Sequence, residues 1–231
     1  MTQEDIDEVV ESFVQAAIDA ERIGFDAIEI HGAHGYLLDQ FFWPGTNRRT
    51  DKYGGSLENR VRFACEIINS IRAKVSSDFP ILFRFSQWKQ QDYTARLAET
   101  PEELGEFLSY LVNAGVDIFH CSQRRFWEAE FEGSELNLAG WTKKLTGKDT
   151  ITVGSVSLNA DFLPEPGDKV FKDGEIASLD GLKQMLVRDE FDLVAVGRAM
   201  IANPDWANRV QSGEFDMLAN FEKKMLMSLI P

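Results

Sequence analysis

The strongest constraint on the fold is an order of elements that repeats along the 231 residues: a helical segment, then a short β-rich run. From Ile6 to Ala20 apolar residues recur at helical spacing, and "FDAIEIH" at 25–31 follows as a candidate strand. The predicted strands are 25–31, 80–86, 116–122, 150–155 and 191–198, and the predicted helices are 6–20, 57–75, 102–114 and 178–188. Strands joined through helices run parallel, so all five carboxyl ends meet on one rim.

Polar residues gather where these predicted strands end. Because barrel enzymes bind ligands at the carboxyl ends of their strands, this rim predicts an α/β fold of the TIM-barrel type. A closed barrel of this type has eight strands, and only five are predicted here. The predicted rim residues are His31, Arg84, Ser86, Ser122, Gly154, Ser155, Gly197 and Arg198.

Length and charge narrow the class further. The chain is long enough for one sizeable core, and we treat residues 1–231 as a single domain. A formal net charge of −14 disfavours nucleic acid and anionic membranes as partners. Cys65 and Cys121 offer neither a disulfide framework nor a metal-binding spacing, and no apolar stretch is long enough to cross a membrane. We expect a cytoplasmic protein without a signal peptide.

The segment "EIHGAHGY", residues 29–36, is the densest candidate site. Alternation sets Glu29 and His31 on one face of the strand, and the glycines that follow allow a turn that brings His34 and Tyr36 close to His31. Two imidazole N–H groups can hold one substrate oxygen, and a phenol can donate a proton at neutral pH. Alternatively, the histidines satisfy backbone carbonyls; a metal site would need further ligands, which the sequence does not obviously supply.

Two further features of the predicted rim favour a ligand. Arg84 interrupts an apolar strand, which is costly unless the guanidinium contacts a ligand or forms a buried salt bridge, for which Glu29 is the candidate partner. "VGS" at 153–155 and "VGR" at 196–198 end the last two predicted strands. Free backbone N–H groups and an arginine at those positions are typical of a barrel phosphate site.

The chain resembles the Old Yellow Enzyme family of FMN-dependent NAD(P)H oxidoreductases. The resemblance is densest in "GFDAIEIHGAHGYLLDQFFWPGTNRRTDKYGGSLENR" at 24–60 and continues through "FRFS" around Arg84, "VGSV" at 153–156 and "VAVGRAMIANPDW" at 194–206. It implies that His31 and His34 bind the substrate oxygen and that Tyr36 donates the proton. It also implies that Arg84 lies against the flavin, and that Gly154, Ser155, Gly197 and Arg198 hold the FMN phosphate.

The implied reaction passes a hydride from NAD(P)H through FMN to an activated alkene or a nitro compound. Within the densest part, "TNRRTDKYGGSLENR" is more typical of scaffold than of chemistry. We expect Asn47, Arg49, Asp51 and Tyr53 to hold a loop together and Ser56 to cap the following helix.

The five predicted strands match only the fourth to eighth strands of the family's barrel. We therefore expect a partial barrel whose open side is covered by self-association or by a complementing N-terminal half. Two alternatives remain: a non-catalytic half-barrel that needs such a partner, and a barrel isomerase or lyase that binds a sugar phosphate.

Overall fold

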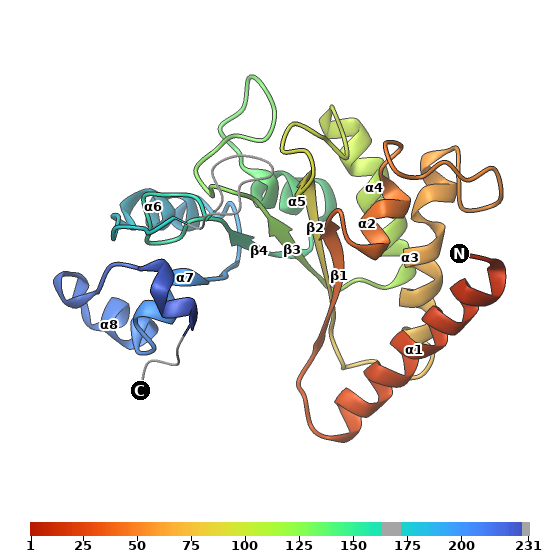
Figure 1. Ribbon diagram of the computed structural model, residues 1–231, viewed down its shortest axis with the longest axis horizontal. Coiled ribbons are helices and arrows are strands. Elements are labelled where there is room, and N and C mark those ends of the chain that lie inside the picture. The colour runs from red at the N-terminus through yellow and green to blue at the C-terminus, as the bar shows by residue number, and fades with distance from the viewer. Residues whose placement is uncertain (163–171, 228–231) are drawn as a thin grey trace.

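The computed structural model describes residues 1–162 and 172–227. Over these residues the chain forms one parallel sheet whose spatial order follows the order of the strands along the chain (Figure 1). The strands are β1 (Ile28–His34), β2 (Ile81–Lys89), β3 (Ile118–Ser122), β4 (Asp149–Val153) and β5 (Leu193–Val194). The predicted α/β class with a parallel sheet is therefore confirmed.

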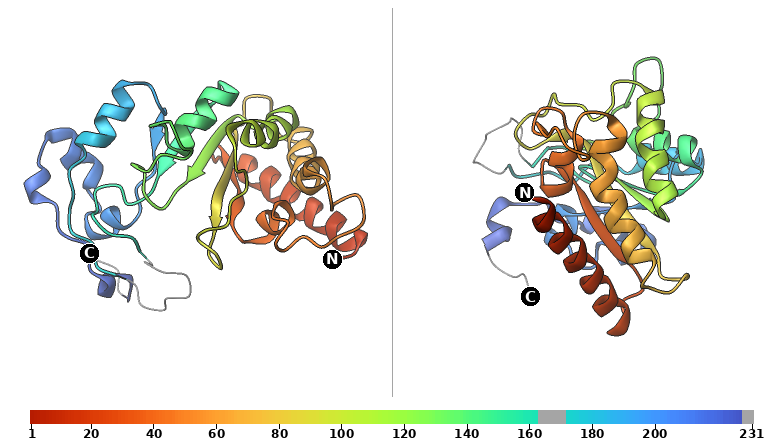
Figure 2. Two further views of the ribbon diagram at one scale, coloured as in Figure 1. Left: turned by 90° about the horizontal axis from the view of Figure 1, so that it is seen from above. Right: turned by 90° about the vertical axis from the view of Figure 1, so that its right-hand side faces the viewer.

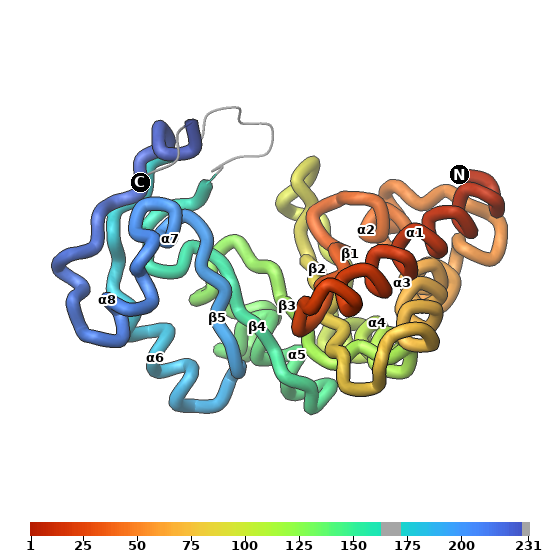
Figure 3. Tube along the Cα trace, turned by 90° about the horizontal axis from the view of Figure 1, so that it is seen from below, coloured from red at the N-terminus to blue at the C-terminus, as the bar shows by residue number. Residues whose placement is uncertain are grey.

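Helices connect the strands and form a continuous outer layer. In sequence order, α1 packs on α3, α3 on α4 and α4 on α5, so neighbouring helices follow the sheet along one side (Figure 2). The helices are α1 (Gln3–Arg22), α2 (Leu37–Phe42), α3 (Leu57–Arg72), α4 (Pro101–Ala114), α5 (Leu138–Thr146), α6 (Asp180–Val187), α7 (Arg198–Ala202) and α8 (Trp206–Ser212), followed by the 3₁₀ turns η1 (Phe215–Met217) and η2 (Lys223–Met227). The result is an open arc with α1 and α2 towards one end and α6 to α8 towards the other (Figure 3).

Local sequence signals explain the helix boundaries. The hydroxyl of Thr2 accepts a hydrogen bond from the backbone of Asp5, whose carboxylate bonds back to Thr2, so α1 begins with a capping box. Ser56 caps α3 in the predicted way, and Thr100 caps α4 with Pro101 in the first turn. None of these helices ends on a proline.

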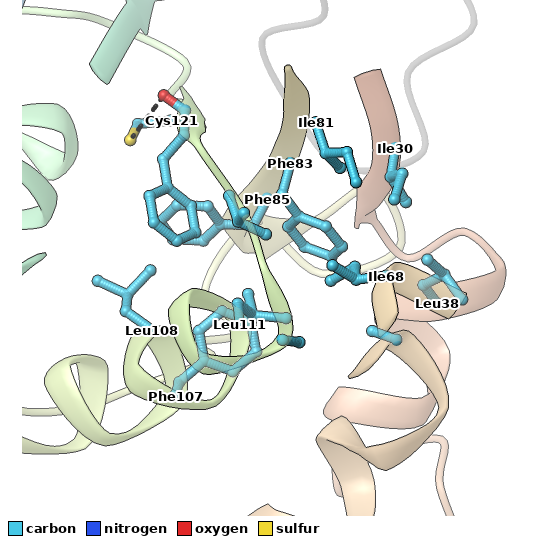
Figure 4. Close-up of a cluster of buried hydrophobic side chains, with 14 of the residues drawn as sticks. Ile30, Leu38, Ile68, Ile81, Phe83, Phe85, Phe107, Leu108, Leu111 and Cys121 are labelled. Atoms are coloured by element: carbon cyan, nitrogen blue, oxygen red, sulfur yellow. Dashed lines mark hydrogen bonds between the residues drawn. The ribbon is translucent and has the colours of Figure 1, made fainter. Parts of the chain in front are cut away.

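The core lies between the sheet and its helices. Phe83 and Phe85 of β2 face Phe107 and Leu111 of α4, and all four side chains are almost fully buried (Figure 4). The intervening residues point the other way, and Arg84 pairs with His120 in the register between β2 and β3. Leu193 of β5 is 50% exposed. The inner face of the arc, which is the side of the sheet away from the helices, thus carries a partly uncovered apolar side chain.

The structure corrects several sequence expectations. The first strand starts later than predicted and continues past His31 to His34, because His34 still pairs with Lys89 of β2. The last strand has only two residues, which pair with Ile151 and Thr152 of β4, and Arg198 begins a helix instead of ending a strand. Helix α5 was not predicted. The segment 155–177, whose Gly- and Pro-rich sequence predicts a long loop, lies partly outside the described residues; its described ends meet through a bridge between Leu158 and Ile176.

Candidate active site

An irregularity in the sheet shapes the end of β1. Gly32 pairs with Phe85 and His34 with Lys89, so three residues of β2 lie opposite the single residue Ala33. Such a bulge redirects side chains and is common beside functional sites. Here it lets Ser86 Oγ accept a hydrogen bond from the His34 backbone N–H at 2.9 Å and stacks Trp88 on the His34 ring, with centroids 4.6 Å apart.

The predicted trio of His31, His34 and Tyr36 is brought together. The ring of His31 lies 5.3 Å from that of His34 and 5.6 Å from that of Tyr36, measured between centroids. Tyr36 is half-exposed, and its hydroxyl lies 3.4 Å from Gln90 Oε1. The three side chains therefore form one cluster at the rim, with an accessible phenol.

His34 is held as a neutral imidazole. Burial, followed by the positive charge of Arg84, lowers the pKa of His34 from 6.5 to about 3. Its Nε2 lies 2.7 Å from Ser122 Oγ, which also accepts a hydrogen bond from Arg84 Nη2 at 3.2 Å. Ser122 thus links the histidine cluster to the arginine inside the sheet.

Arg84 does not form a salt bridge with Glu29, which the sequence left open as the alternative to a ligand contact. The Glu29 carboxylate instead lies 2.7 Å from His120 Nδ1, on the neighbouring inward-facing position of β3. Burial is the largest single influence on the pKa of Glu29 and raises it. The hydrogen bond from His120 and the charges of His120 and Arg84 together outweigh burial, so the pKa lies below its ordinary value. Arg84 therefore sits beside an anionic group without direct neutralisation.

The ends of β4 and β5 supply the other half of the site. Gly154 has φ +130°, and a Cβ there would lie 2.6 Å from the carbonyl oxygen of Gln123, so only glycine fits. Arg198 Nη2 donates to the carbonyl oxygen of Ala160 at 2.7 Å and to Ser155 Oγ at 3.3 Å. Ser155 has φ 51°, a conformation that serine adopts less readily than glycine.

These two halves line one pocket of about 390 Å³. Six of the eight predicted site residues contribute to its wall: His34, Arg84, Gly154, Ser155, Gly197 and Arg198. His31 stands beside the pocket through its contact with His34, and Tyr36 in turn contacts His31. Two guanidinium atoms, Arg84 Nε and Arg198 Nη1, are buried and have no hydrogen-bond partner among the residues that the structure describes. Unpartnered buried donors favour a ligand with acceptor atoms.

Several wall residues were missed as functional candidates. Trp88 and Tyr93 pack edge to face, and Arg124 lies over the Tyr93 ring with its guanidinium carbon 3.9 Å from the centroid. Arg124 also pairs with Asp161 at 2.9 Å. The sequence signal was present in "SQWKQQDY" and "SQRRFW", where aromatic and basic residues follow strands, but spacing alone could not bring the two loops together.

The segment predicted as scaffold behaves as one. Asn47 Nδ2 donates to the carbonyl oxygens of Phe41 and Tyr53, at 2.7 and 2.8 Å. Arg49 pairs with Asp51, whose carboxylate also accepts the Tyr53 N–H at 3.1 Å. The loop between α2 and α3 is therefore fixed by its own side chains.

Two classes of site receive no support. The part of the chain that the structure describes contains no group of three or more histidine, cysteine or acidic side chains placed to hold a metal ion. None of its helices combines the length and apolar character needed to span a bilayer. Cys65 and Cys121 are free thiols.

Comparison with known proteins assigns the chain to a family. Residues 1–216 match the model of the NADH:flavin oxidoreductase / NADH oxidase family. The chain is 38% identical over 221 residues to an NADH oxidase of Thermoanaerobacter brockii and 35% identical over 212 residues to an NADPH dehydrogenase of Halalkalibacterium halodurans. These alignments cover 92% and 89% of this chain, but only 30% and 54% of the relatives.

Structural comparison agrees with this assignment at the level of the fold. The chain superposes on an Old Yellow Enzyme homologue of Zymomonas mobilis with a TM-score of 0.74 at 20% identity, covering 100% of this chain and 58% of that one. The α/β architecture, the parallel sheet and the rim pocket thus occur together with a family match over most of the sequence. The chain belongs to the NADH:flavin oxidoreductase / NADH oxidase family, the Old Yellow Enzyme family that its motifs resemble.

Proposed function

We propose that this chain is the flavin- and substrate-binding part of an FMN-dependent NAD(P)H oxidoreductase of the ene-reductase type. Its five strands correspond to the fourth to eighth strands of the family's barrel, and residues 1–231 form one partial barrel domain. The observation that carries the proposal is the single pocket in which His34 and Arg84 meet the glycine-rich ends of β4 and β5.

The pocket fits the anionic end of FMN. Arg198 Nη1 has no hydrogen-bond partner among the described residues, and Gly154 lets the end of β4 pass close to the backbone at Gln123. A phosphate accepts several hydrogen bonds at once, so it would satisfy Arg198 Nη1. The Ser155 hydroxyl lies within hydrogen-bond distance of the carbonyl oxygens of Arg124 and Ala160 and would turn from them to reach the phosphate. Gly154, Ser155, Gly197 and Arg198 are the residues that would hold it.

Arg84 fits the other end of the cofactor. Its Nε is a buried donor without a partner among the described residues, and its Nη2 is already bound by Ser122. An acceptor on the flavin ring would satisfy Nε, and the positive charge would stabilise an anionic reduced flavin. When bound, FMN supplies hydride transfer from NAD(P)H to the substrate.

The histidines and the tyrosine would act on the substrate itself. His34 stays neutral, so it can donate a hydrogen bond to a carbonyl or nitro oxygen and leave the proton transfer to Tyr36. A guanidinium can only donate, so the Ser122 hydroxyl oxygen accepts from Arg84. The Ser122 hydroxyl then donates its proton to His34 Nε2, which satisfies Arg84, Ser122 and His34 together. The imidazole proton of His34 is left on Nδ1. His31 adds a second donor, and the accessible phenol of Tyr36 supplies the proton to the substrate carbon.

The substrate class follows from this set of groups. Donors that converge on one oxygen beside a proton donor favour an alkene activated by a carbonyl or nitro group. The aromatic side chains of Trp88 and Tyr93 offer an apolar wall next to His34 for the carbon skeleton.

The partly exposed strand β5 at the edge of the sheet supports a second proposal, that of a partner chain. The inner face of the arc exposes half of Leu193, and the chain spans about half of the H. halodurans relative. A complementing N-terminal half-barrel, or a second copy of the chain, would cover this face. In that case the chain alone is a non-catalytic half-barrel. An isomerase or lyase acting on a sugar phosphate is less well supported, because the pocket wall formed by the described residues includes no lysine.

Anaerobic reduction of added FMN tests the proposal. The chain is incubated with FMN and NADPH or NADH, alone and together with the N-terminal barrel half of a relative, and flavin bleaching is followed by absorbance. We expect the flavin absorbance to bleach as FMN is reduced, and to return when an activated alkene reoxidises the flavin. Bleaching only in the presence of the added half supports the half-barrel proposal, and no bleaching in either mixture contradicts the oxidoreductase proposal.

A further inference from the structure

The turn that carries His34 and Tyr36 has an unusual backbone. His34 and Gly35 follow each other with φ values of 63° and 79°. The left-handed region costs roughly 1 to 2 kcal/mol for a residue with a side chain. Only His34 bears this cost, because glycine adopts positive φ freely, so the backbone at His34 needs other contacts to keep it in place.

Three side chains provide these contacts. Ser86 Oγ accepts the His34 N–H at 2.9 Å, and Asp39 Oδ2 accepts the Gly35 N–H at 2.6 Å. Gln40 Nε2 donates to the carbonyl oxygen of Gly35 at 2.8 Å. The backbone N–H groups of His34 and Gly35 thus both donate to side chains that lie outside the turn.

The Asp39 carboxylate is part of a buried ion pair. Its other oxygen lies 2.6 Å from Lys89 Nζ, and neither side chain has any exposed surface. Lys89 also donates to the backbone carbonyl oxygen of Ser86 at 3.3 Å. One lysine therefore ties together the two groups, Asp39 and Ser86, that hold the two N–H groups of the turn.

Stability alone does not explain this arrangement. Removing two charges from water costs several kcal/mol for each ion, and well-packed apolar replacements for a buried pair are often neutral or stabilising. Burial raises the pKa of Asp39 and lowers that of Lys89, each against the attraction of its partner. What apolar residues cannot provide is an acceptor for the Gly35 N–H.

We propose that Asp39 and Lys89 are positioning residues that fix the His34–Tyr36 turn through the Gly35 N–H. The catalytic side of this inference rests on the proposed function, because it is His34 and Tyr36 that the turn presents to the substrate. The geometric side concerns the turn itself and can be measured without flavin or substrate.

Two double variants separate positioning from stability. Asp39→Leu with Lys89→Met removes the charges and the acceptor. Asp39→Asn with Lys89→Gln also removes the charges, but keeps an amide oxygen for the Gly35 N–H and a donor for the Ser86 carbonyl. Amide hydrogen exchange of Gly35 is measured by NMR in both, together with thermal unfolding, which shows that each variant is folded.

We expect Gly35 to exchange at least about tenfold faster in the Leu/Met variant than in the wild type, the equivalent of one lost hydrogen bond of about 1.4 kcal/mol. In the Asn/Gln variant, its exchange should stay within about threefold of the wild-type rate, a smaller loss because a neutral acceptor remains. Equal exchange in the two variants would overturn the proposal.

A third variant covers the case in which the Leu/Met protein does not fold. Ser86→Ala removes the acceptor of His34 only, so His34 should exchange faster while Gly35 remains protected by Asp39. Loss of protection at both amides would show that Asp39 does not hold Gly35, and would also overturn the proposal.

Turnover then separates this inference from the proposed function. With NADPH and an activated alkene, kcat should fall at least about tenfold in the Leu/Met variant and recover in the Asn/Gln variant, with KM for NADPH unchanged, as expected for a transition-state contact. A wild type that shows no turnover, either alone or with the added N-terminal half, contradicts the proposed function, whereas the exchange measurements still decide the role of Asp39.

Discussion

Acidification should destabilise this fold through His34. In the unfolded chain its pKa is the ordinary 6.5, whereas burial and Arg84 lower the folded value to about 3. Between these two values the unfolded state binds the extra proton, so the free energy of unfolding falls as the pH falls. At about 1.4 kcal/mol per unit, His34 alone removes about 2 kcal/mol between pH 7 and pH 5.

Other groups titrate in the same range, so the effect must be read as a difference. Burial raises the pKa of Glu130 from 4.5 to about 7, against the attraction of Arg96. The folded state therefore binds that proton at a higher pH than the unfolded state does. Glu130 thus raises the free energy of unfolding as the pH falls through the same window. A wild-type curve on its own mixes the two opposing contributions.

The variant His34→Asn isolates the histidine. Asparagine tolerates a positive φ better than most residues, so it suits the backbone at this position. Urea unfolding of both proteins is followed at pH 7, 6 and 5 by circular dichroism. The matched control is His31→Asn, three residues earlier on the same strand, where the side chain is more exposed and the change should be smaller.

We expect the stability advantage of the wild type over His34→Asn to shrink by about 2 kcal/mol from pH 7 to pH 5. A difference that does not change with pH would refute the assignment of His34 as a partly buried, neutral imidazole. That result would also remove the reason for its holding a neutral substrate oxygen.

Two further substitutions test other parts of the account. Gly154→Ala should destabilise the fold by more than Gly24→Ala. Both glycines have positive φ, which costs alanine roughly 1 to 2 kcal/mol, but only at Gly154 would the new Cβ meet backbone, as near as 2.6 Å. Equal shifts in thermal unfolding would contradict the close approach. Ser56→Ala should cost about 1 kcal/mol in urea unfolding by removing the cap of α3, with Ser77→Ala as a control outside any helix start; equal losses would count against the cap.

The sequence was sufficient for the overall pattern, because period and alternation are local properties of the chain. Helical spacing around Ile6 to Ala20 and the apolar run before Arg84 predicted α1 and β2, and the order of elements predicted a parallel sheet. Six of the eight predicted site residues meet at one pocket, since parallel strands bring their carboxyl ends to one rim.

What the sequence could not provide depends on pairing between strands. The bulge opposite Ala33 carries β1 on to His34, and no local pattern reports it. His120 pairs with the Glu29 carboxylate that the sequence offered as a possible partner of Arg84. The register between β2 and β3 sets His120 beside Arg84, and no local pattern reports it. Lys89 and Asp39, 50 residues apart, meet only in the folded chain.

The comparison of FMN with riboflavin tests the central claim most directly, because the two ligands differ only in the phosphate assigned to Gly154, Ser155, Gly197 and Arg198. Binding to the chain is measured by quenching of flavin fluorescence, in the wild type and in Arg198→Met. The account predicts that FMN binds at least about tenfold tighter than riboflavin, as expected for a charge-assisted contact of roughly 1.5 kcal/mol or more, and that Arg198→Met removes most of this preference. Equal affinities for the two flavins, or a preference that survives in Arg198→Met, would contradict it.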